Sequence, residues 1–209
     1  MFLDSLIESA LLLAVIVISN CSQERDFGLL YTPPGKVDWS VILESWMNST
    51  NKNLRFSAKL IAGHLSHVLE DNQLYLLDLP CDELTSFVEL FCESVKSETL
   101  LGSGFGCQFS AEELAYSLRN FLLSDNNFSL ISTSLDMPIS LFKLFVKGGF
   151  GIKQECCRIL LYLLNSSDFK DSFRKLKSVN ILADSDSDDP ATLKFLRQCV
   201  YLSLHQGQG

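Results

Sequence analysis

Histidine is the first residue type in this sequence that suggests a catalytic or metal-binding site. His64 and His67 are followed by Glu70, at a spacing that a helix could use for two metal ligands. The order differs from HExxH, in which a catalytic glutamate lies between the two histidines. Only one other histidine, His205, is present to supply a further nitrogen ligand. A histidine pair that faces solvent or lines a groove is the better interpretation, and we expect no metal site.

The glycine-rich segment 102–106 (GSGFG) has the composition of a phosphate-binding loop. No lysine follows at the required position, and the segment lies between stretches with helical patterns rather than after a strand. We therefore interpret it as a flexible insertion between two helices.

The acidic segment 184–189 (DSDSDD) is similar in its first positions to a calcium-binding loop. The sixth position of such a loop is glycine and the twelfth is glutamate, whereas this chain has Asp189 and Phe195 there. The better interpretation is that Asp189 caps a helix that begins at Pro190. Phosphorylation of Ser185 by an acid-directed kinase remains an alternative, because Asp188 lies three residues after it.

Nucleophilic catalysis needs a serine or cysteine beside a histidine base and an orienting acid. None of the three histidines lies in a motif of this kind, so we expect no catalytic residues, no enzymatic activity and no cofactor. The seven cysteines are scattered, mostly on apolar helix faces, which favours a reducing compartment. Cys156 and Cys157 are adjacent and point to different faces of a helix, so we expect one in the core and the other nearer the surface.

Composition limits the classes of partner. The chain has 209 residues, of which 47% are hydrophobic, and a net charge of −8. An acidic protein binds nucleic acid or anionic membranes only through a local basic patch. The one basic segment, 170–177, has the spacing of a solvated helix face. We therefore predict a single domain, 1–209, that does not bind nucleic acid.

The apolar segment 10–18 (ALLLAVIVI) has the composition of a signal-peptide core, a membrane helix or a buried helix. It is too short to span a bilayer, and Asp4 and Glu8 precede it where a secretory signal has basic residues. We interpret it as a buried helix and predict a cytoplasmic protein that is not in a membrane. Four N-glycosylation sequons keep a targeting segment open as the alternative.

The segment 137–165 has the pattern of a helical hairpin. Apolar residues recur at helical spacings on both sides of Gly148 and Gly149, which we interpret as the turn. Pro138 lies near the start of the first helix, where a proline costs no hydrogen bond. Neither helix can bury its apolar face alone, so the hairpin must pack against other elements.

The rest of the chain repeats this hairpin. Phe56-Ser-Ala recurs as Phe109-Ser-Ala after about 53 residues. The segment 122–128 recurs as 163–169 after about 41, and Cys157 is followed by Cys199 after about 42. The longer first spacing is accounted for by the glycine-rich insertion. Ser110, followed by two glutamates, has the pattern of a helix N-cap.

These repeats resemble armadillo repeats and, more loosely, HEAT repeats, each unit being a short helix, a second helix and a longer third helix. The resemblance implies an all-α, right-handed α-solenoid of about four to five units, with approximate bounds 1–31, 32–79, 80–136, 137–178 and 179–209. The glycine that usually precedes the proline of a unit is absent from Asp78-Leu-Pro and Asp136-Met-Pro. The units are also similar to armadillo regions that precede TIR domains in invertebrate signalling proteins.

The resemblance implies a protein-binding scaffold, since third helices of armadillo proteins line a concave groove. An aromatic residue and an asparagine four positions apart often bind the partner there, and Tyr116 and Asn120 have this spacing. The corresponding positions in the flanking units are Gly63 with His67, and Arg158 with Tyr162. No tryptophan occupies the aromatic position. The predicted partner-binding residues are His67, Tyr116, Arg119, Asn120, Arg158 and Tyr162, and ordinary exposed helix residues are the alternative interpretation.

A second hypothesis is that the protein senses a small anionic metabolite or nucleotide through His67, Arg119 or Arg158. Solenoids normally end in polar capping helices, whereas this chain begins with an apolar segment. We therefore expect either end-to-end self-association or a longer parent chain.

Overall fold

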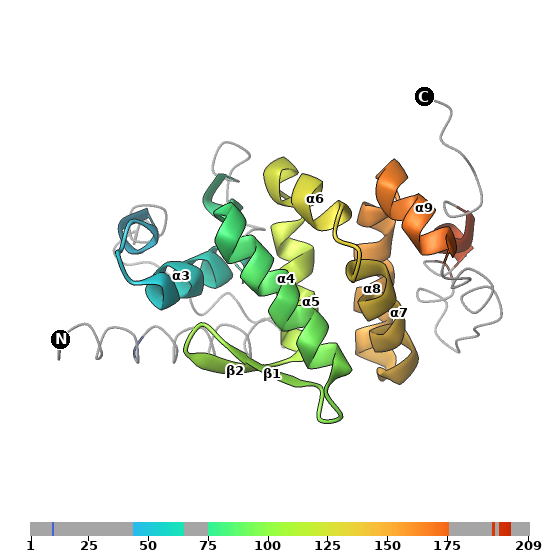
Figure 1. The fold of residues 1–209 in the computed structure, drawn as a ribbon, viewed down its shortest axis with the longest axis horizontal. Coiled ribbons are helices and arrows are strands. Elements are labelled where there is room, and N and C mark those ends of the chain that lie inside the picture. Colours follow the sequence, from blue (N-terminus) through green and yellow to red (C-terminus); the bar gives the residue numbers. More distant parts are fainter. Residues whose placement is uncertain (1–9, 11–43, 65–74, 176–193, 195–196, 202–209) are drawn as a thin grey trace, which may run out of the picture.

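The computed structural model describes residues 10, 44–64, 75–175, 194 and 197–201, and these form a mostly helical protein (Figure 1). The predicted helical class is confirmed at this level. The elements in chain order are α3 (Lys52–His64), α4 (Cys81–Lys96), β1 (Leu101–Gly104), β2 (Cys107–Ser110), α5 (Ala111–Phe121), α6 (Asp125–Ser132), α7 (Met137–Lys147), α8 (Phe150–Leu163) and α9 (Ser167–Lys175). The segments 10–18, apart from Ala10, and 184–189 lie outside the described residues, as does His67.

The long helices pack in two layers. Helix α4 lies against α7 in one layer, and α5 lies against α8 and α3 in the other. Each helix of the first layer also contacts the next long helix of the chain, α4 with α5 and α7 with α8. The α4/α5 and α7/α8 pairs therefore stand side by side, with α3 at one end and α9 at the other (Figure 1). The short helix α6 contacts α4, and α9 contacts α7.

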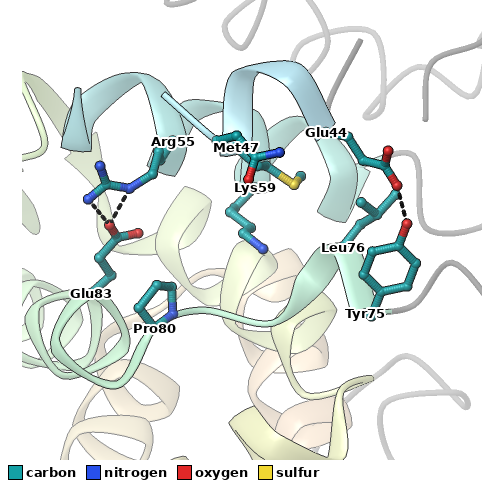
Figure 2. Close-up of a pocket in the computed structure, with 9 residues that line it drawn as sticks. Glu44, Met47, Arg55, Lys59, Tyr75, Leu76, Pro80 and Glu83 are labelled. Carbon is teal, nitrogen blue, oxygen red and sulfur yellow. Dashed lines mark hydrogen bonds and ion pairs between the residues drawn. The ribbon is translucent and has the colours of Figure 1, made fainter. Parts of the chain in front are cut away.

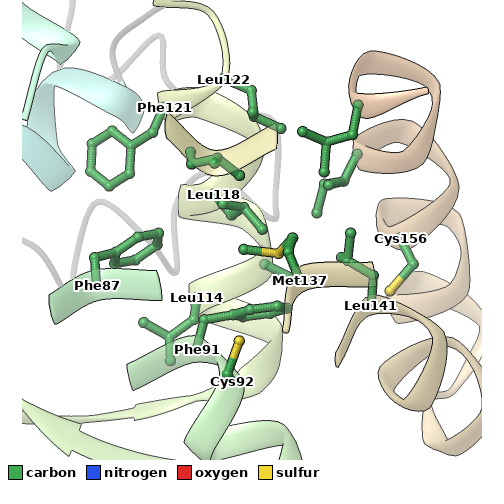
Figure 3. Close-up of a cluster of buried hydrophobic side chains, with 14 of the residues drawn as sticks. Phe87, Phe91, Cys92, Leu114, Leu118, Phe121, Leu122, Met137, Leu141 and Cys156 are labelled. Atoms are coloured by element: carbon green, nitrogen blue, oxygen red, sulfur yellow. The ribbon is translucent and has the colours of Figure 1, made fainter. Parts of the chain in front are cut away.

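The core lies between these layers, where side chains from α4, α5, α7 and α8 meet (Figure 3). Phe87 of α4 and Phe121 of α5 pack edge to face, with ring centroids 5.1 Å apart. Phe56 of α3 joins them, 5.8 Å from Phe87. All three rings are fully buried, and burying a phenylalanine stabilises a fold by about 1.5–3 kcal/mol. The aromatic cluster therefore fastens α3 to the α4/α5 pair.

The segment 101–110 forms a β-hairpin, so the all-α expectation and the predicted flexible insertion are wrong here. Leu101 pairs with Ser110, and Gly104 with Cys107. The turn residues Phe105 and Gly106 both have positive φ, 50° and 78°, which is the conformation that suits a two-residue hairpin turn. The Phe105 ring stacks on Phe56 of α3 with centroids 3.6 Å apart. The hairpin is thus ordered by a contact with a helix far away in the sequence.

Helix ends follow the local signals. Ser110 caps α5 through a reciprocal capping box, in which its Oγ accepts from the Glu113 backbone N–H at 3.2 Å and its own N–H donates to the Glu113 carboxylate at 2.7 Å. Pro138 lies in the first turn of α7. Gly148 and Gly149 separate α7 from α8. All three predictions are confirmed.

Cys156 and Cys157 are both fully buried, so the prediction that one lies nearer the surface is wrong. Helix α8 is covered by α5 and α7, and the Cys199 thiol donates to the backbone carbonyl of Cys157 at 3.5 Å. The carboxy-terminal segment therefore covers a face of α8 that the sequence pattern assigned to solvent.

Among the described residues, no single helix combines the length and apolar character needed to cross a membrane. Helices α6 and α7 meet that test only as a pair, and the pair is bent by 88°.

Candidate functional site between helices α5 and α8

A charged cluster joins the two neighbouring helices that carry most of the predicted partner-binding residues. Glu155 of α8 lies between two arginines. Its Oε2 is 3.2 Å from Nη1 of Arg119 on α5 and 3.3 Å from Nη1 of Arg158 on its own helix. The Glu155 side chain is only 11% exposed, whereas those of Arg119 and Arg158 are 22% and 39% exposed. The cluster therefore has a buried anion beneath two partly solvated cations.

The two oxygens of Glu155 are held differently. Nε of Arg119 lies 3.1 Å from Oε1, yet Oε1 has no hydrogen bond of acceptable geometry. We regard this second contact as ionic, because the distance fits an ion pair while the angle does not fit an N–H donor. The carboxylate thus keeps one acceptor position that the arginines do not fill.

The guanidinium of Arg119 is fixed by its own helix. It lies over the ring of Tyr116, one turn earlier on α5, with its central carbon 4.5 Å from the ring centroid. A stack of this kind contributes about 0.5–1 kcal/mol at a partly exposed site. Arg119 is also in the last turn of α5, where a positive charge interacts favourably with the helix dipole. These interactions within α5 therefore orient Arg119 toward α8 in the unbound protein.

Asn120 is buried, at 5% exposure, rather than open to solvent. Its Oδ1 lies 3.5 Å from Nη2 of Arg119, at the limit of a hydrogen bond. A Cβ added to Gly63 of α3 would meet the Asn120 Cβ at 3.3 Å, so α3 and α5 approach closely at this point. The Asn120 side chain therefore lies between α5 and α3 and contacts the Arg119 guanidinium.

The structure brings four of the six predicted site residues together. Tyr116, Arg119 and Asn120 of α5 meet Arg158 of α8 through Glu155. Tyr162 is one turn further along α8 and is 40% exposed. His67 lies outside the described residues.

Glu155 is the member of the cluster that the repeat pattern does not reveal. It precedes Arg158 by three positions on an amphipathic helix, which is a favourable spacing for an ion pair. That spacing is the one signal in the sequence for an ion pair at Glu155. It does not indicate that Glu155 also contacts a second arginine, on α5.

Burial raises the pKa of Glu155 above its ordinary value of 4.5, and the neighbouring Glu112 carboxylate adds to the shift. Arg119 and Arg158 lower the pKa but do not cancel the effect of burial. The folded protein therefore binds this proton more tightly than the unfolded chain does. The stability that protonation of Glu155 contributes is complete below the pKa of this residue in the unfolded chain. It is lost as the pH rises through the raised pKa of the folded protein.

Replacing Glu155 with glutamine tests this assignment. We expect E155Q to gain stability relative to the wild type as the pH is raised from about 4 to about 8, because glutamine cannot ionise. Urea unfolding midpoints of the two proteins across this range give the comparison. A difference that stays constant with pH, or that changes in the opposite direction, would show that the charged carboxylate is well compensated by the arginines.

No protein-family model matches this sequence, and no curated protein matches it significantly. Guanidinium N–H groups donate to carboxylates and to peptide carbonyls, and a half-exposed tyrosine supplies an apolar face with a polar tip. This combination suits recognition of a polypeptide segment.

Proposed function

We propose that the protein is a non-enzymatic scaffold that binds a segment of a partner protein along the layer formed by α3, α5 and α8. The observation that carries the proposal is the Arg119–Glu155–Arg158 cluster, which joins two successive helices of that layer. Arginine and tyrosine are, with tryptophan, the residue types enriched among the residues that dominate binding energy at protein interfaces. The cluster contains arginines, and Tyr162 on the same helix as Arg158 is exposed.

The order of the helices supports an armadillo-like superhelix. The short α6, the second helix α7 and the longer α8 follow one another as in an armadillo unit, and α9 begins after α8. One unit earlier, a single 3₁₀ turn at residues 75–77 precedes α4 and α5. Helices α3, α5 and α8 take the place of third helices, since α5 contacts both of the others. Third helices form the inner wall of such a superhelix, and the cluster lies on this wall.

The charge balance of the cluster favours a peptide over a small anion. Glu155 already accepts from both arginines, and the Glu112 carboxylate lies close enough to raise the Glu155 pKa. Two cations facing two anions leave little net positive potential for a phosphate or carboxylate ligand. The alternative of an anionic-metabolite sensor is therefore the weaker proposal.

Site-specific photo-crosslinking in cells that express the protein provides the test. We expect p-benzoylphenylalanine at Tyr162 to capture one contiguous segment of a partner, identified by mass spectrometry. The control position is Lys143, which is exposed on α7 in the other layer. Equal capture of the same segment from both positions would contradict the proposed face.

The captured segment then allows a quantitative measurement. We expect Arg158→Ala to weaken its affinity about tenfold, which corresponds to about 1.4 kcal/mol. The matched control is Lys143→Ala, which removes one positive charge from the other layer. An unchanged dissociation constant for R158A would remove the cluster from the binding face.

A further inference from the structure

A groove of about 500 Å³ lies between α4 and the segment 130–136, which runs from the end of α6 to the N-cap of α7. We call it the α4/α6 groove. None of the described residues that line it belongs to α3, α5 or α8, so it shares no residue with the proposed peptide-binding layer. The lining residues are Leu84, Thr85, Val88, Glu89 and Cys92 of α4, with Leu130, Thr133, Ser134, Leu135 and Asp136 of the segment 130–136.

The groove has apolar surface that solvent reaches. Leu135 is 84% exposed and Leu130 is 44% exposed, and Val88 is partly exposed on α4. Leu84 and Cys92 are almost closed to solvent, at 1% and 3%, and form the floor. Exposed apolar residues that gather at one place with polar residues around them mark an interaction site. An occupant of the groove would therefore contact the two leucines and the valine rather than the floor.

The charged residues that line the groove are both acidic. Glu89 is exposed, and no hydrogen bond or ion pair joins its carboxylate to another of the described residues. Oδ2 of Asp136 lies 3.4 Å from Nζ of Lys96, but both side chains are more than half exposed, and a pair of this kind contributes little to stability. Burial raises the pKa of the Cys92 thiol, and Asp136 and Glu89 add to the shift. The two carboxylates thus act on the same part of the floor, where they favour an occupant with positive charge.

The threonine hydroxyls of the groove are already used within the chain. Thr85 donates to the carbonyl of Cys81 at 2.8 Å, and Thr133 donates to the carbonyl of Leu130 at 2.9 Å. An extended peptide would bring backbone N–H and C=O groups into the groove that lose water without finding new partners. A helix satisfies these groups internally, and its side chains recur at the same four-residue spacing as the lining residues of α4. The wall therefore favours a helical occupant.

A second depression, the α3/α4 pocket of about 370 Å³, offers less to a partner. It is lined by residues of the segments 44–48, 55–59 and 75–83 (Figure 2). Glu83 accepts from Nε and Nη2 of Arg55 at 2.9 and 2.6 Å, and Glu44 accepts from the Tyr75 hydroxyl. Lys59 extends from α3 into the same space (Figure 2). Both carboxylates are thus engaged within the chain, whereas that of Glu89 in the α4/α6 groove is exposed.

We propose that the α4/α6 groove binds an amphipathic helix of a partner protein, with lysine or arginine beside its apolar face. Apolar side chains four residues apart on the partner pack against Leu130, Leu135 and Val88. A basic side chain next to them pairs with Glu89 and Asp136. Burial of the exposed leucines supplies affinity, and the two carboxylates select the charge of the partner. This surface is additional to the proposed peptide-binding layer and can be occupied independently of it.

Peptides selected from a random phage-displayed library on the full chain test the stated chemistry. We expect the enriched sequences to carry apolar residues four positions apart and a net positive charge. Fluorescence polarisation on the synthesised peptides gives their dissociation constants. A proline at the centre of a selected peptide should abolish its binding, because proline breaks a helix interior. Enrichment of acidic sequences, or full affinity of the proline variant, would overturn the assignment of a basic helix.

Two pairs of variants locate the peptides on the protein. We expect Leu135→Ser to weaken binding at least tenfold, whereas Val146→Ser, which removes an apolar side chain 55% exposed on α7 outside the groove, leaves it unchanged. Glu89→Lys should weaken binding at least fivefold, and Glu98→Lys, the same change in charge on the exposed turn after α4, should not. Melting curves show whether each variant is folded. Equal affinities of folded L135S and the wild type would place the peptides outside the groove and contradict the proposal.

Sedimentation of the chain without peptide distinguishes a partner helix from a second copy. We expect the wild type and L135S to form the same species at every concentration. Self-association that L135S abolishes would assign the groove to a second copy instead. A selection that yields no peptide sensitive to L135S would exclude the groove as a docking site. Arg158→Ala should leave the affinity of the selected peptides unchanged, so failure of this proposal can be told apart from failure of the proposed function.

Discussion

Replacing Arg55 with methionine is expected to lower the free energy of unfolding by about 3–5 kcal/mol. The reason is the asymmetry of the Arg55–Glu83 pair, in which the glutamate side chain is 1% exposed and the arginine 27%. Removing the arginine leaves a buried carboxylate that water cannot reach. Arg55 also donates to the backbone carbonyls of Ser49 and Thr50 at 2.9 and 3.1 Å, so the segment before α3 loses two hydrogen bonds as well. Urea denaturation measures the loss.

Second-site variants separate the buried charge from the lost packing. Arg55→Met combined with Glu83→Leu leaves no unpaired ion, and we expect it to recover most of the lost stability. The deficit that remains, about 1 kcal/mol, reflects the two backbone hydrogen bonds. Adding Lys59→Met to the single variant prevents that lysine from replacing Arg55. A double variant no more stable than R55M alone would show that the ion pair is not what holds α3 to α4.

Helix boundaries were predictable where their signals are local. A serine with a glutamate three residues later specifies the start of α5, and a proline in the first turn specifies the start of α7. A pair of glycines ends that helix. These interactions join residues within one turn, so they are present in the sequence itself.

Features that depend on distant contacts were not predictable. The strand LGSG shows no alternation of apolar and polar residues, and CQFS alternates over only four residues. Their hairpin is held by Phe105 stacking on Phe56. Burial of Cys157 depends in the same way on Cys199. Each contact joins residues more than 40 positions apart, which a pattern within one helix cannot reveal.

The candidate site was predictable in part for the same reason. The resemblance to armadillo repeats implied that Tyr116 and Asn120 are partner-binding positions, and the repeat spacing carried these positions to Arg158 and Tyr162. It could not indicate that Asn120 packs beneath Arg119 against Gly63, because that depends on how closely α3 and α5 approach. The α3/α4 pocket was not predictable, since its wall is assembled from residues 44–48, 55–59 and 75–83.

Replacing Gly148 with serine is expected to lower the free energy of unfolding by about 2–3 kcal/mol, because the turn between α7 and α8 has no room for a side chain. A Cβ at this position would lie 2.5 Å from Cγ2 of Ile152 and 2.8 Å from the carbonyl oxygen of Leu144. The backbone itself is relaxed, with φ of −76°, so the loss would come from packing alone. Urea unfolding at neutral pH measures it.

The adjacent glycine supplies a matched control. Nothing lies within 4 Å of a Cβ built on Gly149, and that residue is the N-cap of α8, with extended φ and ψ. Serine is a favoured N-cap residue, so G149S should change the free energy of unfolding by less than about 0.5 kcal/mol.

Replacing Ile152 with alanine should rescue G148S only partly, because the Leu144 carbonyl is backbone and stays in place. If G148S were as stable as G149S, the first turn of α8 would move at no cost. The positions of Glu155 and Arg158, one and two turns later, would then not be fixed by the packing of α8 on α7.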